Sequence, residues 1–272
     1  MRDGDPLVNG TLTVWPQVGR ATGAQAISLR ILEFAPGLSP GLCNADCDEI
    51  LYVLRREPRH AGSLAGQPGW VARPVHLSGQ SERTVEAGKR AHIFIDGNPY
   101  TVDPDTGIYL RPGETLAVNN PGPDAIVIVS CHCPEPESPL DFATPLTAPA
   151  PDSTPPRSPL VSLADRPAQP TADRWYRVLV DDEVGSTQAT QFVGSIPPGR
   201  APDHFHTYEE VLFILKGEGR MWAGESNTPI APGSCIYLPK GQVHCVENTG
   251  KDELRLLGVF YPAGSPSVRY DV

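Results

Sequence analysis

Short apolar runs separated by turn residues extend along most of the chain. Clear examples are AISLRILEF at 26–34, HIFIDGNPYTV at 92–102 and DAIVIVSCHCP at 124–134. Proline and glycine separate these runs and are abundant, with 31 and 26 copies among 272 residues. Runs of strand length bounded by such residues are typical of β-strands, and the proline content argues against helices. The pattern predicts an all-β fold.

An internal repeat predicts two related units. IYLRPGETLAVNNPGPDAIVIVSCHCP at 108–134 aligns without gaps to IYLPKGQVHCVENTGKDELRLLGVFYP at 236–262. Upstream, PGLSPGLCNADCDEILYVL resembles PGRAPDHFHTYEEVLFIL with a slip of one residue. Such self-similarity indicates one architecture built twice. The first copy carries an insertion somewhere in 56–107. The predicted parts are a first barrel, a proline-rich linker and a second barrel, at 1–133, 134–172 and 173–272.

The stretch 199–248 concentrates groups that bind metals. Side chains of a strand alternate between its two faces. The alternation places His204, His206, Tyr208 and Glu210 on one face and leaves Glu209 facing out. Two imidazoles and a carboxylate would then share one wall, and His244, after the turn at 239–241, is the candidate for a fourth ligand.

These ligands suit one divalent transition metal, which is Fe, Mn, Ni, Cu or Zn. The glycines, prolines and ligands of the stretch resemble the two cupin motifs, with one residue fewer than usual between Gly199 and His204. The first motif matches Gly199, His204, His206, Glu210 and Gly217, and the second matches Gly233, Pro239, Gly241, His244 and Asn248. The resemblance implies two cupin (jelly-roll) barrels in one chain, a bicupin. It further implies that His204, His206, Glu210 and His244 hold the metal in the second barrel.

The first copy departs from the motif at three of the four ligand positions. Cys43, Ala45 and Leu116 stand where the second copy has histidines, and only Glu49 is retained. A lone carboxylate does not hold a metal ion, so the first barrel is predicted to be metal-free and structural. A thiolate site using its cysteines is the weaker alternative, since their spacing differs from that of zinc motifs.

Eleven prolines occur from Pro134 to Pro170, both included. Such chain is extended and forms neither helix nor central strand. It is either a free linker or a segment that wraps over a barrel, and we favour the wrapped form. The apolar anchors would be Leu140, Phe142, Leu146, Leu160 and Leu163.

Charge and composition exclude several classes of partner. The net charge is −10 and no basic run occurs, which argues against nucleic-acid binding. No apolar run has membrane-spanning length, and the N-terminus lacks the pattern of a secretory signal. A cytoplasmic protein with reduced cysteines is therefore predicted, either as a monomer or as a homodimer.

Other groups near the predicted site have less certain roles. One of the two tyrosines Tyr208 and Tyr237 is a candidate to donate a hydrogen bond to a metal-bound substrate, although core packing is the favoured interpretation. Phe213 is placed at the barrel mouth or wall. Cys235 and Cys245 flank the predicted site, with Cys245 pointing away from the ion.

The leading hypothesis for function is a metal-dependent oxidoreductase of the dioxygenase type, similar to quercetinase-like cupins. Its substrate would be a small hydroxylated or carboxylated metabolite, with Glu210 and Tyr208 as candidate catalytic residues. A non-oxidative isomerase, decarboxylase, lyase or hydrolase is the second hypothesis. A non-catalytic cupin that binds a small molecule is the third.

Overall fold

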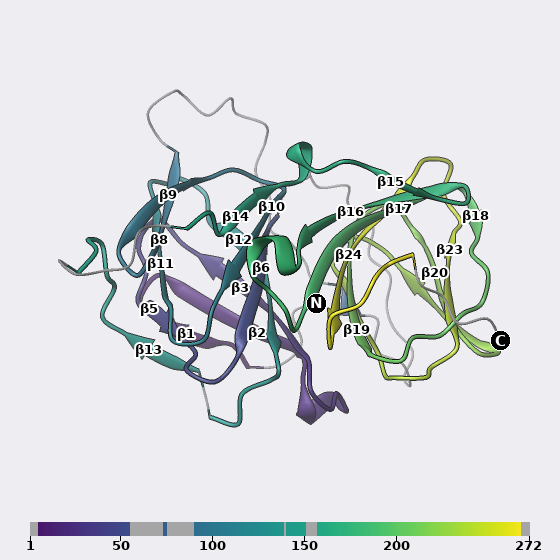
Figure 1. Cartoon of the computed structure of the whole chain (residues 1–272), viewed down its shortest axis with the longest axis horizontal. Coiled ribbons are helices and arrows are strands. Elements are labelled where there is room, and N and C mark those ends of the chain that lie inside the picture. The colour runs from purple at the N-terminus through teal and green to yellow at the C-terminus, as the bar shows by residue number, and fades with distance from the viewer. Residues whose placement is uncertain (1–4, 55–72, 75–89, 139, 151–156, 268–272) are drawn as a thin grey trace.

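The chain folds into two β-barrels that pack side by side (Figure 1). The computed structural model describes residues 5–54, 73–74, 90–138, 140–150 and 157–267. Strands dominate these residues, and the helical elements are short 3-10 turns at Arg20–Thr22, Leu163–Asp165 and Asp182–Val184. The predicted all-β fold and the predicted pair of barrels are confirmed.

The first barrel consists of a seven-stranded and a six-stranded sheet. The larger sheet contains, in spatial order, β1 (Leu7–Asn9), β2 (Leu12–Val18), β3 (Ser28–Phe34), β12 (Ile126–Cys133), β6 (Asp48–Val53), β10 (Thr106–Leu110) and β14 (Leu160–Ser162). The smaller sheet contains β13 (Asp141–Ala143), β5 (Gly41–Cys43), β11 (Thr115–Asn120), β8 (Ala91–Ile95) and β9 (Asn98–Val102), and β4 (Gly37–Leu38) also pairs with β11.

The second barrel repeats this arrangement with a seven-stranded and a four-stranded sheet. Its larger sheet contains β15 (Gln169–Thr171), β16 (Arg174–Val180), β17 (Thr190–Ile196), β24 (Leu254–Tyr261), β19 (Glu209–Lys216), β22 (Ser234–Leu238) and β7 (Arg73–Pro74). Its smaller sheet contains β18 (Gly199–Arg200), β23 (His244–Asn248), β20 (Gly219–Ala223) and β21 (Ser226–Ile230).

The structure locates the insertion predicted within 56–107 more closely, in the segment before β8. Strands β8 and β9 form a hairpin in the first barrel, just as β20 and β21 do in the second. Most of the remaining insertion lies outside the described residues. Its described part, β7, crosses to the second barrel and pairs with the edge of β22. The insertion therefore contributes a strand to the sheet that also carries Glu210.

In the first barrel, polar side chains of the protein surround Glu49, the one residue of the ligand set that this barrel retains. Glu49 is buried, and its Oε1 accepts hydrogen bonds from Arg30 at 2.7 Å and Ser130 at 2.6 Å, while Oε2 accepts one from Asn44 at 2.8 Å. His132 Nε2 lies 3.7 Å from the same carboxylate. Burial alone would raise the pKa of Glu49, but the charge of Arg30 and these neighbours hold that pKa well below its usual range. Protein donors thus saturate the retained carboxylate.

The register of the strands identifies what Arg30 replaces. Arg30 lies opposite Ser130 in the pairing of β3 with β12, and Phe192 lies opposite Gly258 in the equivalent pairing of β17 with β24. An arginine therefore takes the position of a phenylalanine. A Cβ atom on Gly258 would lie 2.3 Å from the Phe192 ring, so the aromatic ring requires the glycine. This difference gives a physical reason for the prediction of a metal-free first barrel.

The two barrels share one apolar core where their larger sheets face each other. Side chains of both barrels form it, including Ile50, Tyr52, Cys131, Val211, Phe213 and Val259. Glu209 lies on the face of β19 that points away from the ligands, as predicted, but it is only 6 % exposed because the first barrel covers that face. Its carboxylate accepts hydrogen bonds from the backbone N–H groups of Gln25, Ala26 and Ile27 at 2.9–3.0 Å and from the Tyr237 hydroxyl at 2.6 Å. A carboxylate of the second barrel thus binds a loop of the first.

The described part of the proline-rich segment packs against the barrels, as predicted. β13 pairs with β5, β14 with β10, and β15 with β16. Four of the predicted anchors contact the cores, namely Leu140, Phe142, Leu160 and Leu163. Leu146 is 44 % exposed, so its prediction as an anchor is wrong.

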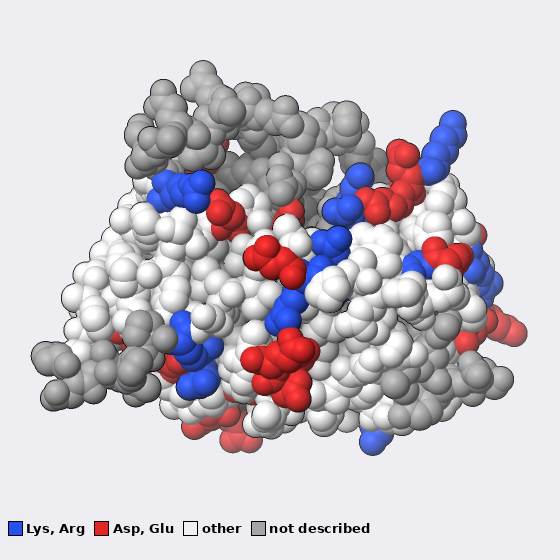
Figure 2. Space-filling model, turned by 45° about the horizontal axis from the view of Figure 1, so that its top comes forward, with Lys and Arg blue, Asp and Glu red and all other residues white. Residues whose placement is uncertain are grey.

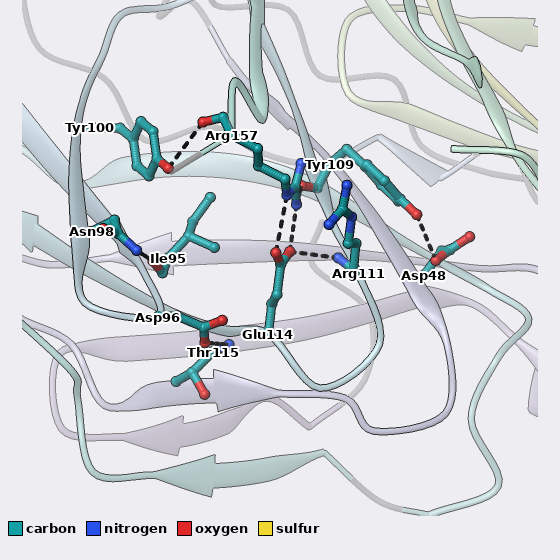
Figure 3. Close-up of polar contacts among 10 residues, drawn as sticks. All are labelled: Asp48, Ile95, Asp96, Asn98, Tyr100, Tyr109, Arg111, Glu114, Thr115 and Arg157. Atoms are coloured by element: carbon teal, nitrogen blue, oxygen red, sulfur yellow. Dashed lines mark hydrogen bonds and ion pairs between the residues drawn. The ribbon is translucent and has the colours of Figure 1, made fainter. Parts of the chain in front are cut away.

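Arg157 fixes this segment to the first barrel (Figure 3). Its guanidinium pairs with the carboxylate of Glu114 and donates to the carbonyl of Tyr109 at 2.5 Å. The Tyr100 hydroxyl donates to the Arg157 carbonyl at 3.2 Å, and Glu114 also accepts the backbone N–H of Arg111. These bonds satisfy polar groups of the segment where proline cannot extend the sheet ladder.

The surface carries charges of both signs. On the face shown in Figure 2, basic and acidic side chains alternate in small groups along the junction of the barrels. Among the described residues, no helix is long and apolar enough to cross a membrane.

Substituting Arg30 by Met is expected to destabilise the protein by about 3–5 kcal/mol, because the buried carboxylate of Glu49 loses its counter-charge. The double variant R30M/E49Q removes that charge and is expected to recover at least half of the loss. Urea unfolding of the metal-free protein at pH 7 measures both effects. A double variant that is no more stable than R30M would show that the unpaired charge is not the cause.

Candidate metal centre

A loop and two strands together bring the predicted ligands to one place. β19 begins only at Glu209, so the prediction of one continuous strand through His204, His206 and Glu210 is wrong. His204 instead forms an isolated bridge with His244, with mutual N–H to carbonyl bonds of 3.0 and 2.8 Å. His206 lies in the loop that follows, and its carbonyl accepts the N–H of Gly241 at 2.8 Å. These backbone bonds hold the three imidazoles against the start of β23.

The three histidines converge on the interior of the second barrel. Each of His204, His206 and His244 offers a ligand nitrogen, and these atoms all lie within 4.8 Å of one another. Glu210, the second residue of β19, points to the same place. Its Oε2 lies 3.4 Å from His244 Nε2 and 3.8 Å from His206 Nε2. The structure therefore brings together the four residues that the sequence predicted as ligands.

Backbone carbonyls select the tautomers of two imidazoles. His244 Nδ1 lies 2.7 Å from the carbonyl of Gln242, and His204 Nδ1 lies 3.1 Å from that of Pro202. Because a carbonyl oxygen only accepts, each Nδ1 carries the proton and donates it. The Nε2 lone pairs are then available for a metal ion, and the rings are fixed in orientation.

Unpartnered polar atoms indicate that a cation fits this site. Glu210 is 4 % exposed, and its Oε2 has no hydrogen-bond donor among the described residues. An ionised, buried carboxylate oxygen without a donor is costly unless a positive charge approaches it. Neutral imidazole nitrogens and a carboxylate are the donor set of zinc and of the redox-active divalent metals. The residues present therefore fit the implied ion.

The pKa shifts of the imidazoles follow from burial and from the neighbouring charges. Burial, together with the proximity of His244, lowers the pKa of His204 to about 4. Burial also lowers the pKa of His206. For His244 burial acts in the same direction, but the negative charge of Glu210, whose Oε2 lies 3.4 Å from His244 Nε2, outweighs it and raises the pKa. His204 and His206 are thus neutral at pH 7, the form in which imidazole binds metals.

The ligands line one end of a cavity of about 110 Å³ inside the barrel. Its walls are mainly apolar and include Tyr176, Phe192, Ile196, Leu212, Leu256 and Phe260. Thr171 and Arg174 add polar groups. A metal ion bound by the histidines would therefore lie beside a space lined by aromatic and aliphatic side chains.

Other predicted site residues lie elsewhere. The Tyr208 ring stacks on His206 at 4.9 Å, and its hydroxyl donates to the carbonyl of Ser265 at 3.2 Å. Tyr208 is not among the described residues that line the cavity, so its catalytic role stays a prediction. Phe213 and Tyr237 lie in wall strands of the second barrel, β19 and β22, but their side chains face the junction of the barrels. Cys235 lies in the same junction, so the predictions that Cys235 flanks the site and that Tyr237 donates to a substrate are wrong.

Sequence reasoning missed the residues that form the cavity rather than the ligands. Phe192 and Phe260 contribute aromatic walls, and Phe260 lies 5.2 Å from the His206 ring between centroids. The alignment of the two copies contained a signal for one of them, because Phe260 aligns with His132 of the first copy. Where an apolar residue of one copy aligns with a polar residue of the other, the two barrel interiors differ at that position.

Residues 192–260 match the family model described as "Cupin domain". The second barrel is a cupin domain. The chain covers between about a third and somewhat more than half of the length of the curated relatives it matches. Auxin-binding protein 1 of Arabidopsis thaliana is 34 % identical over 70 residues, covering 22 % of this chain and 35 % of the relative. The oxalate-binding protein of Thermotoga maritima is 36 % identical over 66 residues, covering 24 % and 54 %.

Solved bicupins match the fold of the whole chain. A mutant oxalate decarboxylase of Bacillus subtilis superimposes with a TM-score of 0.71 at 12 % identity, covering 99 % of this chain and 78 % of the other. A putative glyoxylate-induced protein of Pseudomonas aeruginosa gives a TM-score of 0.63 at 13 % identity, covering 94 % and 82 %. The chain therefore has a bicupin fold, with a candidate metal site in its second barrel.

Replacing His206 by Ala is expected to weaken metal binding at least 100-fold, because one imidazole ligand is lost. The wild type should bind one equivalent of Mn²⁺ or Zn²⁺ per chain, measured by titration of the metal-free protein. H92A, which changes a histidine of the first barrel, is the matched control and should bind like the wild type. Retention of one tight equivalent by H206A would contradict the ligand assignment.

The metal-free protein is expected to lose stability as the pH falls from about 6.5 to about 4. In this window the unfolded chain protonates His204 while the folded chain, whose His204 pKa is about 4, does not. H204N should lose about 1–2 kcal/mol less than the wild type between pH 7 and pH 4.5, in urea unfolding at each pH. Equal losses in both proteins would show that His204 is not buried as a neutral group.

Proposed function

We propose that the protein is a metal-dependent cupin enzyme of the dioxygenase type, acting on a small hydroxylated or carboxylated molecule. One observation carries the proposal. Three imidazoles and the carboxylate of Glu210, whose Oε2 has no hydrogen-bond donor among the described residues, meet at the wall of a mainly apolar cavity. A site that only stabilised the fold would not require a cavity beside the ligands, whereas a site for catalysis does.

The residues have separate roles in this proposal. His204, His206 and His244 bind the ion, which supplies Lewis acidity and, if it is iron, manganese, nickel or copper, redox chemistry with dioxygen. Glu210 would be the fourth ligand at rest and, on leaving the ion, would accept the proton of a substrate hydroxyl or carbon acid at its Oε2. The aromatic walls orient the substrate, because Phe192 and Phe260 line the same cavity as the ligands and Phe260 lies 5.2 Å from the His206 ring between centroids.

A second candidate is a non-oxidative protein that binds a small carboxylic acid. The names of the oxalate-binding and auxin-binding relatives favour it. A carboxylate is also a suitable ligand for the open positions of the proposed ion. Whether such a protein is a binder or a decarboxylase, lyase, isomerase or hydrolase depends on chemistry after binding. A monomer or homodimer in the cytoplasm stays our prediction for either candidate.

Protein loaded with Fe²⁺ or Mn²⁺ is expected to consume dioxygen in the presence of a member of a panel of 2-hydroxy acids, 2-oxo acids and polyhydroxylated aromatics. E210Q should lower that rate by about 10²–10⁴-fold, because the proton acceptor is lost. E247Q is the matched control and should keep the rate, because the carboxylate of Glu247 accepts a hydrogen bond from Trp222 Nε1 and lies away from the ligands. An oxygen electrode measures the rate.

If zinc-loaded protein converts a member of the panel without consuming oxygen, the dioxygenase proposal is rejected and the non-oxidative candidate is supported. Full activity of E210Q with bound metal would contradict the assigned role of Glu210.

A further inference from the structure

An arginine lines the same cavity as the metal ligands. Arg174 begins β16, directly after the turn that joins it to β15, and lies opposite Thr171 in the hairpin. Both residues line the cavity that His204, His206 and Glu210 also line. The Arg174 side chain is only 15 % exposed. A guanidinium and a hydroxyl therefore accompany the otherwise apolar walls.

The repeat indicates that the scaffold does not require this arginine. The position of Arg174 at the start of β16 corresponds to that of Leu12 at the start of β2, and both strands carry a register shift at the same place. Leu12 is 0 % exposed and belongs to the apolar core of the first barrel. A leucine is thus sufficient to fill this position, and the metal-binding barrel has a cation there instead.

The ion pair of Arg174 leaves it available to a ligand. Its Nε and NH2 groups lie 3.0 and 2.9 Å from the carboxylate of the preceding residue, Asp173. The side chain of Asp173 is 63 % exposed, so this pair is solvated and weak. Arg30, the inward arginine of the first barrel, instead has the fully enclosed carboxylate of Glu49. Among the described residues, Arg174 has no such buried counter-charge.

We infer that Arg174 binds an anionic group of the substrate whose other end reaches the histidine site. The inference rests on the proposed function, because it places a ligand between the ion and Arg174. A guanidinium binds a carboxylate through two parallel hydrogen bonds, and the low polarity of the cavity walls strengthens such a pair. The substrate class is therefore a small dicarboxylic acid, or a carboxylic acid with a second metal-binding oxygen group, joined by a short apolar body.

Straight-chain dicarboxylates from two to six carbons, each compared with the monocarboxylate of equal length, test this inference. Calorimetric titration of the Mn²⁺-loaded full chain measures their affinities. We expect at least one dicarboxylate to bind about tenfold or more tightly than its monocarboxylate. R174M should remove that preference while changing the affinity for the monocarboxylate less than about twofold.

Two further variants separate the effect of Arg174 from general effects. R255M removes an arginine from the outer face, where Arg255 pairs with Glu253 and lies over Trp175, and it should keep the preference. R174K retains the charge but not the planar fork, and should lower the dicarboxylate preference about three- to tenfold. If R174M unfolds, R174K still decides the question.

The possible outcomes distinguish this inference from the proposed function. No dicarboxylate preference at any length, or an equal preference in R174M, would overturn the role of Arg174 while leaving metal-dependent binding intact. Equal binding of the monocarboxylates by metal-loaded and metal-free protein would contradict the proposed function. If metal-free wild type also prefers a dicarboxylate and metal-free R174M does not, Arg174 is supported as the anion-binding residue whatever the outcome for the metal.

Discussion

The fold and the candidate site both depend on the alternation of side chains at the start of β19. Glu209 and Glu210 are consecutive residues of one strand, so their carboxylates point to opposite faces. Glu209 accepts three backbone N–H groups of the first barrel and the hydroxyl of Tyr237. Glu210 points to the imidazoles of the second barrel. The contact that joins the barrels therefore also fixes the position of the candidate ligand, and the first barrel has a structural part in forming the site.

The two barrels show how one scaffold supports different interiors. In the first, Arg30 and Ser130 fill the space around Glu49 and satisfy its carboxylate. In the second, Phe192 and Gly258 take those positions, and Glu210 retains an oxygen without a donor. The first barrel therefore has an ion pair in which every carboxylate oxygen of Glu49 is hydrogen-bonded. The second has an apolar wall beside Glu210, whose Oε2 lacks a donor among the described residues. The difference between Leu12 and Arg174 acts in the opposite direction, because it places a cation where the first barrel has a core side chain.

Residues that belong to a motif with fixed spacing could be predicted from the sequence. Residues whose role depends on contacts with distant parts of the chain could not. The repeat predicted two barrels, and the motifs predicted His204, His206, Glu210 and His244 because their spacing alone carries the signal. Treating 204–210 as one strand was wrong, since His204 pairs only with His244 before the chain turns. The role of Glu209 depends on residues 25–27, far away in sequence, and no pattern near Glu209 indicates them. The cavity was missed for the same reason, because Phe192, Phe260 and Arg174 meet the ligands only in the folded barrel.

The central claim is that one ion is held in the second barrel by three imidazoles and a carboxylate, with none in the first. Anomalous diffraction from crystals of the full chain, collected on both sides of the absorption edge of the added metal, tests it most directly. The expected result is one anomalous peak per chain, within bonding distance of His204, His206, His244 and the Oε2 of Glu210. A peak beside Glu49, or a peak in the second barrel that lacks the histidines among its ligands, would contradict the claim.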